Sequence, residues 1–488
     1  MKFTPLGRLK TIDAFRDYLH ECDAEVDCDL ELEGASGPLG KTIKIVHADG
    51  TKRTVGNRFC VQPMEGWDCT NKGAPTEHTI RRWRRFGESG AKLVWGGEAF
   101  AVQRDGRANP NQLYLDPDED THDSLNSLLS ELKAAHEESF ERTDDLLVGL
   151  QLTHSGRFSR PDGPMRPLIA EQNPLLAKKY DLPQDTHVLT DDELGTIRDN
   201  MVKAACIAAD VGFDFVDVKA CHGYLVHELL GARTRQGEYG GTFENRTRFF
   251  REVVEGIRQE RPRLLIGCRV SITDLVPFVT EPDTSLGVPM EHSANLPWQH
   301  GFGVDANDPL TPDWAEPVAF LELARSLGVS MVNLTIGSPY YCPHLQRPAA
   351  YPPSDGYTPP RDPLHEVIRH IKTVRAVKER VPGLPMVGSG YSYLQNYLPF
   401  VAQHQVRTGS VDFIGLGRMI LSYHDFPVDV LTGRELKKKM FCRTFSDCTT
   451  GPRNGMISGC FPLDPYYKSM PEAKVSKDIR TAASKARR

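Results

Sequence analysis

The sequence predicts an α/β protein that is built as a single (β/α)8, or TIM, barrel, and two observations carry this prediction. Eight short apolar segments follow one another, mostly as the continuous runs expected of parallel strands covered on both faces. Segments with helical periodicity alternate with them, for example residues 79–89 and residues 232–260, the second with an expected interruption at Gly240-Gly241. The candidate strands are residues 57–64, 91–99, 145–154, 213–219, 263–271, 329–336, 384–389 and 410–417.

Three connecting segments add to this frame. Residues 42–57 alternate in the manner of a β-hairpin, with a turn at Asp49-Gly50. Residues 274–315 and 337–362 are long insertions after the fifth and sixth strands. Because both leave the C-terminal ends of strands, both are expected to overhang a site there.

Composition bounds the class of protein. The chain has 488 residues and a net charge of −6, so its charge gives no case for binding nucleic acid or an anionic membrane. No apolar run approaches the roughly 18 residues of a membrane-crossing helix, and the N-terminus does not read as a signal peptide. Eleven scattered cysteines favour reduced thiols and a cytoplasmic location. The basic tail, Lys474 to Arg488, is expected to be solvated or disordered.

The fourth candidate strand ends in a cluster of titratable side chains. Residues 213–218 are mostly apolar, and Lys219, Cys221, His222 and Tyr224 follow at once. A barrel builds its active site from the C-terminal ends of its strands, so this cluster predicts the catalytic centre.

The seventh and eighth strands end in glycine-rich turns. Gly388, Ser389, Gly390 and Tyr391 close the seventh, and the run from Gly415 to Arg418 closes the eighth. Glycine lets backbone N–H groups approach a phosphate, and barrels commonly bind phosphate at these two strand ends. We therefore predict a phosphate site, with Gly417 beside the phosphate and Arg418 as a forked donor to it.

Two motifs carry a family resemblance. The segment VDVKACHGYL ends the fourth strand, and YGGTFENRTRF follows from Tyr239 to Phe249. Both resemble the old yellow enzyme family of NADH:flavin oxidoreductases, which are FMN-dependent ene-reductases, and the barrel domains of dienoyl-coenzyme A reductase and trimethylamine dehydrogenase. The resemblance implies FMN as cofactor, NADH or NADPH as transient reductant, and a hairpin that closes the bottom of the barrel.

The resemblance also implies which residues contact the flavin. The backbone of Pro63 and Met64 is expected against the ring, and Gln151 and Arg269 at its pyrimidine edge. Glu98 falls where the family touches the ring through a small residue. Other pocket candidates are Trp67, His154, Tyr340, Tyr341 and His344.

The catalytic positions partly depart from the family. Tyr224 matches the family's proton donor and His222 one of the two residues that hold the substrate's oxygen, whereas Lys219 replaces the family's His. Lys219 can polarise an oxygen, bind a carboxylate, lower the pKa of His222, or form a structural ion pair with Asp217 or Glu98. Glu65 replaces a small polar residue near the flavin, where it is expected to be protonated, paired with Lys219, or turned to bind a cationic or polyhydroxy substrate.

Cys442, Cys448 and Cys460 lie where larger relatives bind an iron–sulfur cluster. Their spacing fits only part of the relatives' pattern, and such a cluster usually needs four thiolates. The sequence therefore favours free thiols over a cluster.

These observations predict an FMN-dependent NAD(P)H oxidoreductase that reduces an activated C=C bond of a small molecule, with no metal site. One alternative is a flavin-dependent dehydrogenase or demethylase for a small polar or amine substrate. Another is a metal-dependent barrel hydrolase that uses His154, His222, His227 and Asp274. The expected organisation is an N-terminal extension and hairpin (1–56), the FMN-binding barrel (57–430) and a C-terminal extension (431–488), in a chain that can form homo-oligomers.

Overall fold

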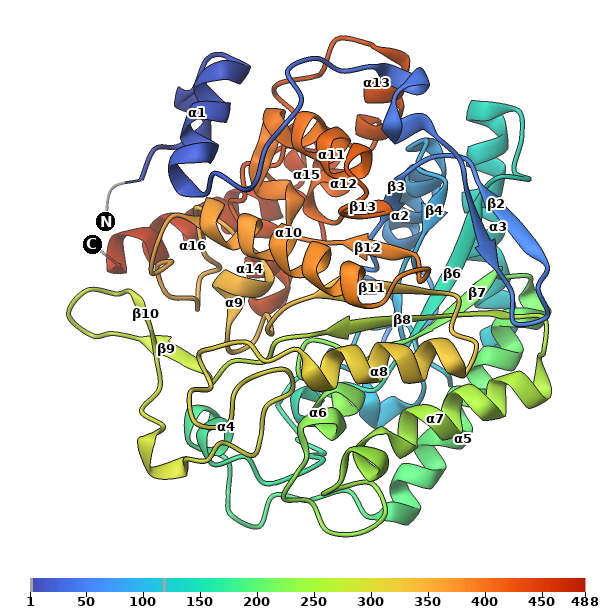
Figure 1. Cartoon of the computed structure of the whole chain (residues 1–488), viewed down its shortest axis with the longest axis vertical. Helices are drawn as coiled ribbons and strands as arrows, with labels where there is room; N and C mark the ends of the chain where they lie inside the picture. The colour runs from blue at the N-terminus through green and yellow to red at the C-terminus, as the bar shows by residue number, and fades with distance from the viewer. Residues whose placement is uncertain (1–2, 117–119, 488) are drawn as a thin grey trace.

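The barrel strands lie where the sequence predicts them. The computed structural model describes residues 3–116 and 120–487, and Figure 1 shows the strands surrounded by helices. The ring runs β4-β3-β13-β12-β11-β8-β7-β6-β5, and β4 also pairs with β6, so it closes with parallel strands throughout. The strands are β3 (Phe59–Val61), β4 (Leu93–Val94), β5 (Ala99–Ala101), β6 (Leu147–Thr153), β7 (Phe215–Val218), β8 (Leu265–Ser271), β11 (Met331–Thr335), β12 (Met386–Gly388) and β13 (Phe413–Leu416).

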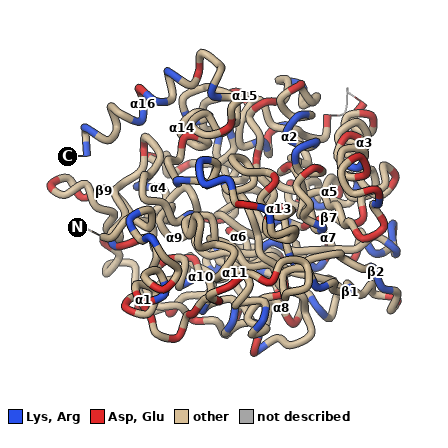
Figure 2. Tube along the Cα trace, turned by 90° about the horizontal axis from the view of Figure 1, so that it is seen from above, with Lys and Arg blue, Asp and Glu red and all other residues tan. Residues whose placement is uncertain are grey.

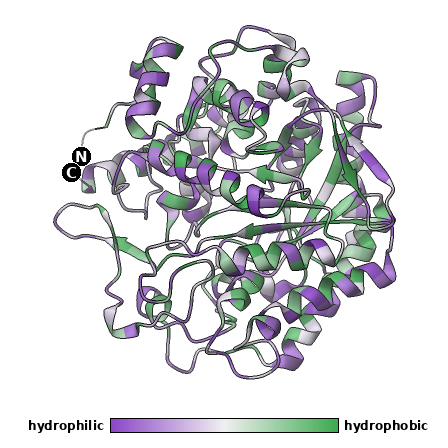
Figure 3. Cartoon of the chain, in the orientation of Figure 1, coloured by the Kyte–Doolittle hydropathy of each residue, from purple (hydrophilic) through white to green (hydrophobic). Residues whose placement is uncertain are grey.

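The predicted second strand forms two pieces, β4 and β5, so the ring has eight strand positions and the (β/α)8 prediction is confirmed. The barrel strands β6 and β8 are buried along their whole length. Most of the barrel strands are hydrophobic, which Figure 3 shows by their green colour. The helices that follow successive strands are α2 (Glu77–Glu88), α3 (Thr121–Phe140), α5 (Asp191–Val211), α7 (Phe243–Glu260), α8 (Ala315–Ser326), α10 (Pro363–Arg380), α11 (Leu398–Arg407) and α12 (Arg418–Ser422) with α13 (Phe426–Thr432).

A hairpin closes the bottom of the barrel, as predicted. Strands β1 (Ile43–Val46) and β2 (Lys52–Val55) pair antiparallel across the turn at Asp49-Gly50. Ile45 and Val55 pack in one cluster with barrel residues such as Trp95 and Phe215. Burying these side chains removes apolar surface from water and seals that end of the ring.

The prediction of helix for residues 232–242 is wrong. Helix α6 (Leu225–Gly231) ends before this segment, and α7 begins only at Phe243. Gly241 adopts a φ of 80°, and the Thr242 side chain accepts a hydrogen bond from the Asn245 N–H and so caps α7. The two glycines and this N-cap residue start the helix later than its apolar periodicity alone suggests.

The two insertions contain little regular structure. Residues 274–315 hold the short hairpin β9 (Phe278–Thr280) and β10 (Gly287–Pro289), and residues 337–362 hold α9 (Pro343–Gln346). Helix α1 (Ile12–Cys22) lies near the N-terminus, and α4 (Pro174–Tyr180) lies between β6 and α5.

The basic C-terminal tail forms a helix, so the expectation of a disordered end is wrong, whereas its mostly exposed side chains fit the expectation of a solvated one. The extension contains α14 (Asp447–Arg453), α15 (Pro465–Lys468) and α16 (Glu472–Ala486), whose basic residues are blue in Figure 2. The Ser476 hydroxyl and the Arg480 guanidinium both donate to the Asp447 carboxylate, at 2.8 and 2.6 Å. These bonds fasten α16 to α14. The division into three segments stays a prediction.

None of the helices in residues 3–116 and 120–487 combines the length and apolar character that crossing a membrane requires.

Candidate active site

A cavity of about 490 Å³ lies at the C-terminal ends of the barrel strands. It brings together most of the residues that the sequence predicts for catalysis and cofactor binding. Those that line it are Pro63, Met64, Glu65, Gln151, Lys219, His222, Tyr224, Arg269, Ser389, Gly390, Gly417 and Arg418. Their roles stay predictions.

Three predicted cofactor residues are not part of the cavity wall: Glu98, Gly388 and Tyr391. The buried Glu98 carboxylate accepts hydrogen bonds from the Gly66 N–H and from Arg82, which also binds Asp68. Burial raises the pKa of Glu98 against the effect of Arg82. Glu98 therefore belongs to a buried ion cluster, and the neighbouring Ala99 lines the cavity in its place.

The Tyr224 hydroxyl connects two other polar side chains that line the cavity. It donates to Glu65 Oε2 at 2.6 Å and lies 2.7 Å from the Tyr340 hydroxyl. Burial and then the charge of Glu65 raise the pKa of Tyr224 well above its usual value. The phenol consequently keeps its proton at neutral pH and has it available to donate.

Lys219 lies against the same ring. Its Nζ is 3.7 Å from the centroid of Tyr224, and burial lowers its pKa. Neither proposed structural partner forms a hydrogen bond or ion pair with it in the described structure; Asp217 instead accepts from Gln151, and Glu98 from Arg82. In the described part of the chain, the Lys219 ammonium has no hydrogen-bond or ion-pair partner, so its donors are available to a ligand.

His222 is held in an unusual backbone conformation. Its φ is 70°, in the left-handed region, and its N–H donates to Ser271 Oγ at 3.0 Å while its carbonyl accepts from Ser338 Oγ at 2.7 Å. Burial, followed by the charges of Arg269 and Lys219, lowers the pKa of His222 well below its usual value. The ring is therefore neutral near pH 7, and its Nε2 lies 3.1 Å from the Gln346 amide nitrogen.

Replacing Glu65 with Gln is expected to move the alkaline limit of activity to lower pH. The Glu65 charge helps raise the pKa of Tyr224, so the neutral amide lets the phenol lose its proton earlier as pH rises. The measurement is the pH profile of alkene-dependent reoxidation of the reduced enzyme, in single turnovers. A variant whose alkaline limb coincides with that of the natural enzyme contradicts this role for Glu65.

One buried carboxylate fixes the two residues predicted at the pyrimidine edge. Asp217 accepts from Gln151 Nε2 and from the Arg269 backbone N–H, both at 2.6 Å. The Gln151 amide oxygen is thereby oriented away from Asp217. Arg269 donates weakly to the Pro63 carbonyl at 3.5 Å, and its Nε is buried with no partner among residues 3–116 and 120–487.

Arg418 lies just after β13, and not all of its N–H groups donate a hydrogen bond within the described structure. Its Nη2 donates to the Pro348 carbonyl at 2.7 Å, and its Nη1 is buried without a partner among the described residues. Close by, the Gln62 amide bonds Ser389 Oγ at 3.1 Å and the Asn333 side chain. A cation and a polar network thus lie where the sequence predicts a phosphate.

The C-terminal extension supplies a wall of the cavity that sequence reasoning missed. Its contributions include Cys448, Thr449, Arg453, Ser458 and Tyr467. The insertion 337–362 also lines the cavity, through Pro339, Tyr340, Gln346, Arg347 and Asp355, whereas 274–315 contributes no lining residue in the described structure. The expectation that both insertions overhang the cavity is thus wrong for 274–315. The only sequence signal for the wall was the group of cysteines.

Asp464 anchors this wall to the barrel. Its buried carboxylate accepts from both terminal nitrogens of Arg81, at 3.0 Å, and from Arg85 at 2.8 Å. Replacing Asp464 with Ala leaves two arginines without their carboxylate, so we expect the free energy of unfolding to fall by about 3–5 kcal/mol.

Thermal denaturation followed by circular dichroism measures this change. The control is Asp144→Ala, because Asp144 forms an exposed pair with Arg142, and such pairs contribute little to stability. Equal midpoints for the two variants would contradict the anchoring role.

Of the other predicted pocket residues, some line the cavity and some do not. Trp67 and Tyr340 line the cavity. Tyr341 instead donates to Asp274 at 2.7 Å, and His344 bonds the Tyr357 hydroxyl at 2.7 Å. His154 is buried beside Gly106.

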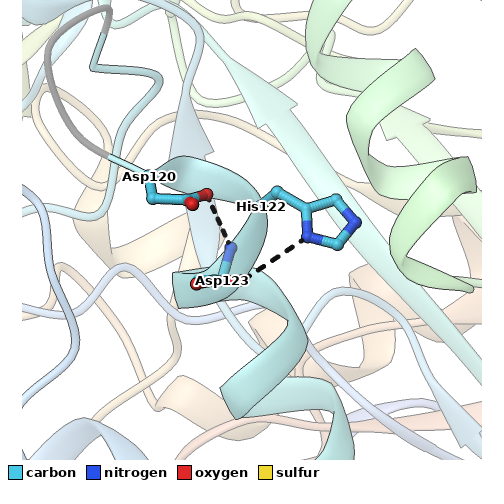
Figure 4. A group of neighbouring side chains, drawn as sticks. All are labelled: Asp120, His122 and Asp123. Carbon is cyan, nitrogen blue, oxygen red and sulfur yellow. Dashed lines mark hydrogen bonds and ion pairs between the residues drawn. The ribbon is translucent and has the colours of Figure 1, made fainter.

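The residues of the hydrolase alternative do not converge. His227 bonds the Gly223 N–H and the Ser271 carbonyl, and Asp274 accepts from Tyr341. In residues 3–116 and 120–487, the only three groups with metal-binding chemistry whose ligand atoms come within 4.8 Å of one another are Asp120, His122 and Asp123. All three are exposed at the start of α3, where Asp120 caps the helix by accepting from the Asp123 N–H (Figure 4).

The three C-terminal cysteines lie near one another. Cys448 lines the cavity, and burial followed by the nearness of the other two thiols raises the pKa of Cys460 well above its usual value. Burial also raises the pKa of Cys442 to about 11. The expectation that they are free thiols without a cluster stays a prediction.

Solved structures share this fold. 2-Naphthoyl-CoA reductase, in complex with 2-naphthoyl-CoA, has a TM-score of 0.65 at 19% identity and covers 88% of this chain and 57% of its own. Histamine dehydrogenase from Rhizobium sp. 4-9 has a TM-score of 0.62 at 22% identity, with coverage of 89% and 53%. The old yellow enzyme homologue from Zymomonas mobilis has a TM-score of 0.54 at 19% identity, with coverage of 83% and 97%. At these identities the likeness is one of fold.

Comparison of sequences also finds relatives of this chain. The NADPH dehydrogenase of Geobacillus sp. (strain WCH70) is 30% identical over 215 residues, which span 42% of this chain and only 56% of the relative. The NADPH dehydrogenase of Bacillus subtilis (strain 168) is 29% identical over 267 residues, or 52% of this chain and 69% of the relative. The profile of one family matches residues 50–307, more than half of the chain and most of the strand ends that form the cavity. The resemblance in the motifs is thereby confirmed, and the chain belongs to the NADH:flavin oxidoreductase / NADH oxidase family.

Proposed function

We propose that this protein is an FMN-dependent oxidoreductase that uses NADH or NADPH to reduce a C=C bond conjugated to a carbonyl group. The observation that carries the proposal is the meeting of Tyr224, Lys219 and His222 at one wall of the cavity. A protonated phenol, a free ammonium and a neutral imidazole are the groups that such a reduction needs.

The residues present fit FMN. Arg418 and Arg269 each keep a buried nitrogen that has no partner in the described part of the chain, and such nitrogens are costly unless a ligand supplies acceptors. Arg418, Ser389 and Gly417 would hold the phosphate, and Gln151 and Arg269 the pyrimidine edge. When bound, FMN supplies two-electron chemistry, taking hydride from the nicotinamide and giving it to the substrate.

The protein's own side chains would activate the substrate's carbonyl group and supply the proton. Lys219 and His222 donate hydrogen bonds to the substrate's carbonyl oxygen, which draws electrons from the conjugated double bond. The Tyr224 hydroxyl gives its proton to the carbon next to the carbonyl. The Tyr340 hydroxyl, 2.7 Å away, is placed to return a proton, and the Lys219 ammonium stabilises negative charge on Tyr224 meanwhile.

Anaerobic reduction tests the proposal. NADH or NADPH is expected to bleach the flavin absorbance of the purified enzyme, and an enone such as 2-cyclohexenone to restore it with formation of cyclohexanone. If neither nicotinamide bleaches the enzyme while a small amine does, the protein oxidises amines and the proposal fails.

A further inference from the structure

Positive charge is concentrated in the cavity. Lysine and arginine side chains outnumber carboxylates among its lining residues by ten to three. The chain as a whole carries a net charge of −6, so this excess is local. A cavity with one sign of charge and low-dielectric walls attracts ligands of the opposite sign.

Several of these cations already have a function. Arg82 is neutralised by Asp68 and Glu98, and Arg81 and Arg85 share Asp464. Under the proposed function, Arg269 and Arg418 serve FMN and Lys219 serves the substrate's oxygen. Four cations are left, of which Arg453 pairs with the exposed Asp355, and we call them the cationic rim: Arg160, Lys179, Arg347 and Arg453.

Arg347 has the clearest unmet need for an anion. Its Nη1 donates to Thr449 Oγ1, whereas its Nη2 is buried without a partner in the described structure. Burial and then the neighbouring charges of Arg453 and Arg418 lower its pKa. An acceptor from a ligand would satisfy this nitrogen and offset the repulsion.

The rim lies beside the predicted catalytic residues. Arg347 follows Gln346, whose amide nitrogen is 3.1 Å from His222 Nε2. Arg453 donates to the carbonyl of Pro339, the residue before Tyr340, at 3.3 Å, and its carboxylate partner Asp355 is 58% exposed. A molecule that extends from Tyr224 and His222 toward the C-terminal wall therefore has these arginines among the groups that it can contact.

We propose that the substrate is an anion, a conjugated carbonyl compound that carries a carboxylate away from its double bond, and that Arg347 and Arg453 bind this carboxylate. This inference rests on the proposed function, since it names the class of molecule that the cavity reduces. The planar fork of each guanidinium suits a carboxylate, which accepts two parallel hydrogen bonds from it.

A matched pair of alkenes tests the inference: 4-(3-oxobut-1-enyl)benzoate and its methyl ester, which differ only in the remote charge. The FMN-loaded enzyme is expected to show a kcat/KM about 10- to 100-fold higher for the acid than for the ester. In the double variant Arg347→Met, Arg453→Gln this ratio is expected to fall to about one. The control Arg142→Gln removes an exposed arginine outside the cavity and is expected to keep the ratio.

The remaining outcomes overturn the inference. A natural enzyme that treats acid and ester alike has no carboxylate site. A double variant that loses FMN assigns Arg347 to the flavin phosphate, and one that loses NADPH but not NADH assigns the rim to the phosphate of NADPH.

Titration calorimetry with the same two compounds separates this inference from the proposed reaction, because it needs no turnover. If neither compound is reduced, yet the acid binds more tightly than the ester and only the double variant loses that preference, the anion site stands and the reaction fails. If both are reduced and bound equally, the reaction stands and the anion site fails.

Discussion

Replacing Tyr224 with Phe is expected to slow reoxidation of the reduced enzyme by enones about 10²- to 10⁴-fold, the range that one positioned proton donor contributes. The Phe ring fills the same buried site, so the fold, the FMN content and the rate of flavin reduction by NADPH are expected to persist. Burial and the charge of Glu65 raise the pKa of Tyr224, so its phenol is protonated at neutral pH and can act as the acid. Stopped-flow absorbance resolves the reductive and oxidative steps separately.

Tyr341→Phe is the matched control. Tyr341 is buried one residue beyond Tyr340, but its hydroxyl serves Asp274 outside the cavity wall. Its removal is expected to leave the oxidative step unchanged. Unimpaired reoxidation of Tyr224→Phe by every accepted alkene contradicts the assignment of Tyr224 as proton donor.

Replacing Gly415 with Ala is expected to release FMN and to lower the free energy of unfolding by about 1–3 kcal/mol, the cost of overpacking a core. A Cβ at Gly415 would lie 1.9 Å from Gln62 Nε2 and 2.5 Å from the Gly388 carbonyl oxygen. Gln62 holds Ser389 and Asn333, so the collision displaces the end of β12 where the phosphate is predicted.

Gel filtration followed by absorbance of the protein peak measures FMN retention, and thermal denaturation measures stability. The control is Gly195→Ala on α5, where the new Cβ meets only the Arg198 side chain at 3.9 Å. A Gly415→Ala protein that keeps its flavin and its midpoint would show that the two glycine-rich strand ends tolerate displacement.

The barrel could be predicted well from the sequence because each of its strands has a recognisable local pattern. Each strand is a continuous buried run, and all the observed strand positions fall within or next to the predicted ranges. The error at residues 232–242 has a local cause too, because Gly241 and the N-cap Thr242 override an apolar periodicity that continues across them. Boundaries set by caps are weaker signals than runs of apolar residues.

The cavity was predictable where motifs end strands and unpredictable where distant segments meet. Lys219, His222 and Tyr224 lie within six residues of one strand end. Arg347 donates a hydrogen bond to Thr449, about one hundred residues further along the chain. Arg81 likewise donates to Asp464, which lies near the other end of the sequence. Such contacts leave no periodicity or spacing in a single sequence. Glu98 illustrates the same limit, because only the fold reveals its partner Arg82.

An absorbance spectrum of the purified protein from 300 to 700 nm, with the released cofactor identified after heating, tests the central claim most directly. Flavin bands and the release of FMN are expected, because the nitrogens of Arg269 and Arg418 that lack a partner in the described structure need an anionic, acceptor-rich ligand. A colourless protein that also fails to take up added FMN would contradict the assignment of the cavity as a flavin site, and with it the roles of Tyr224, Lys219 and His222.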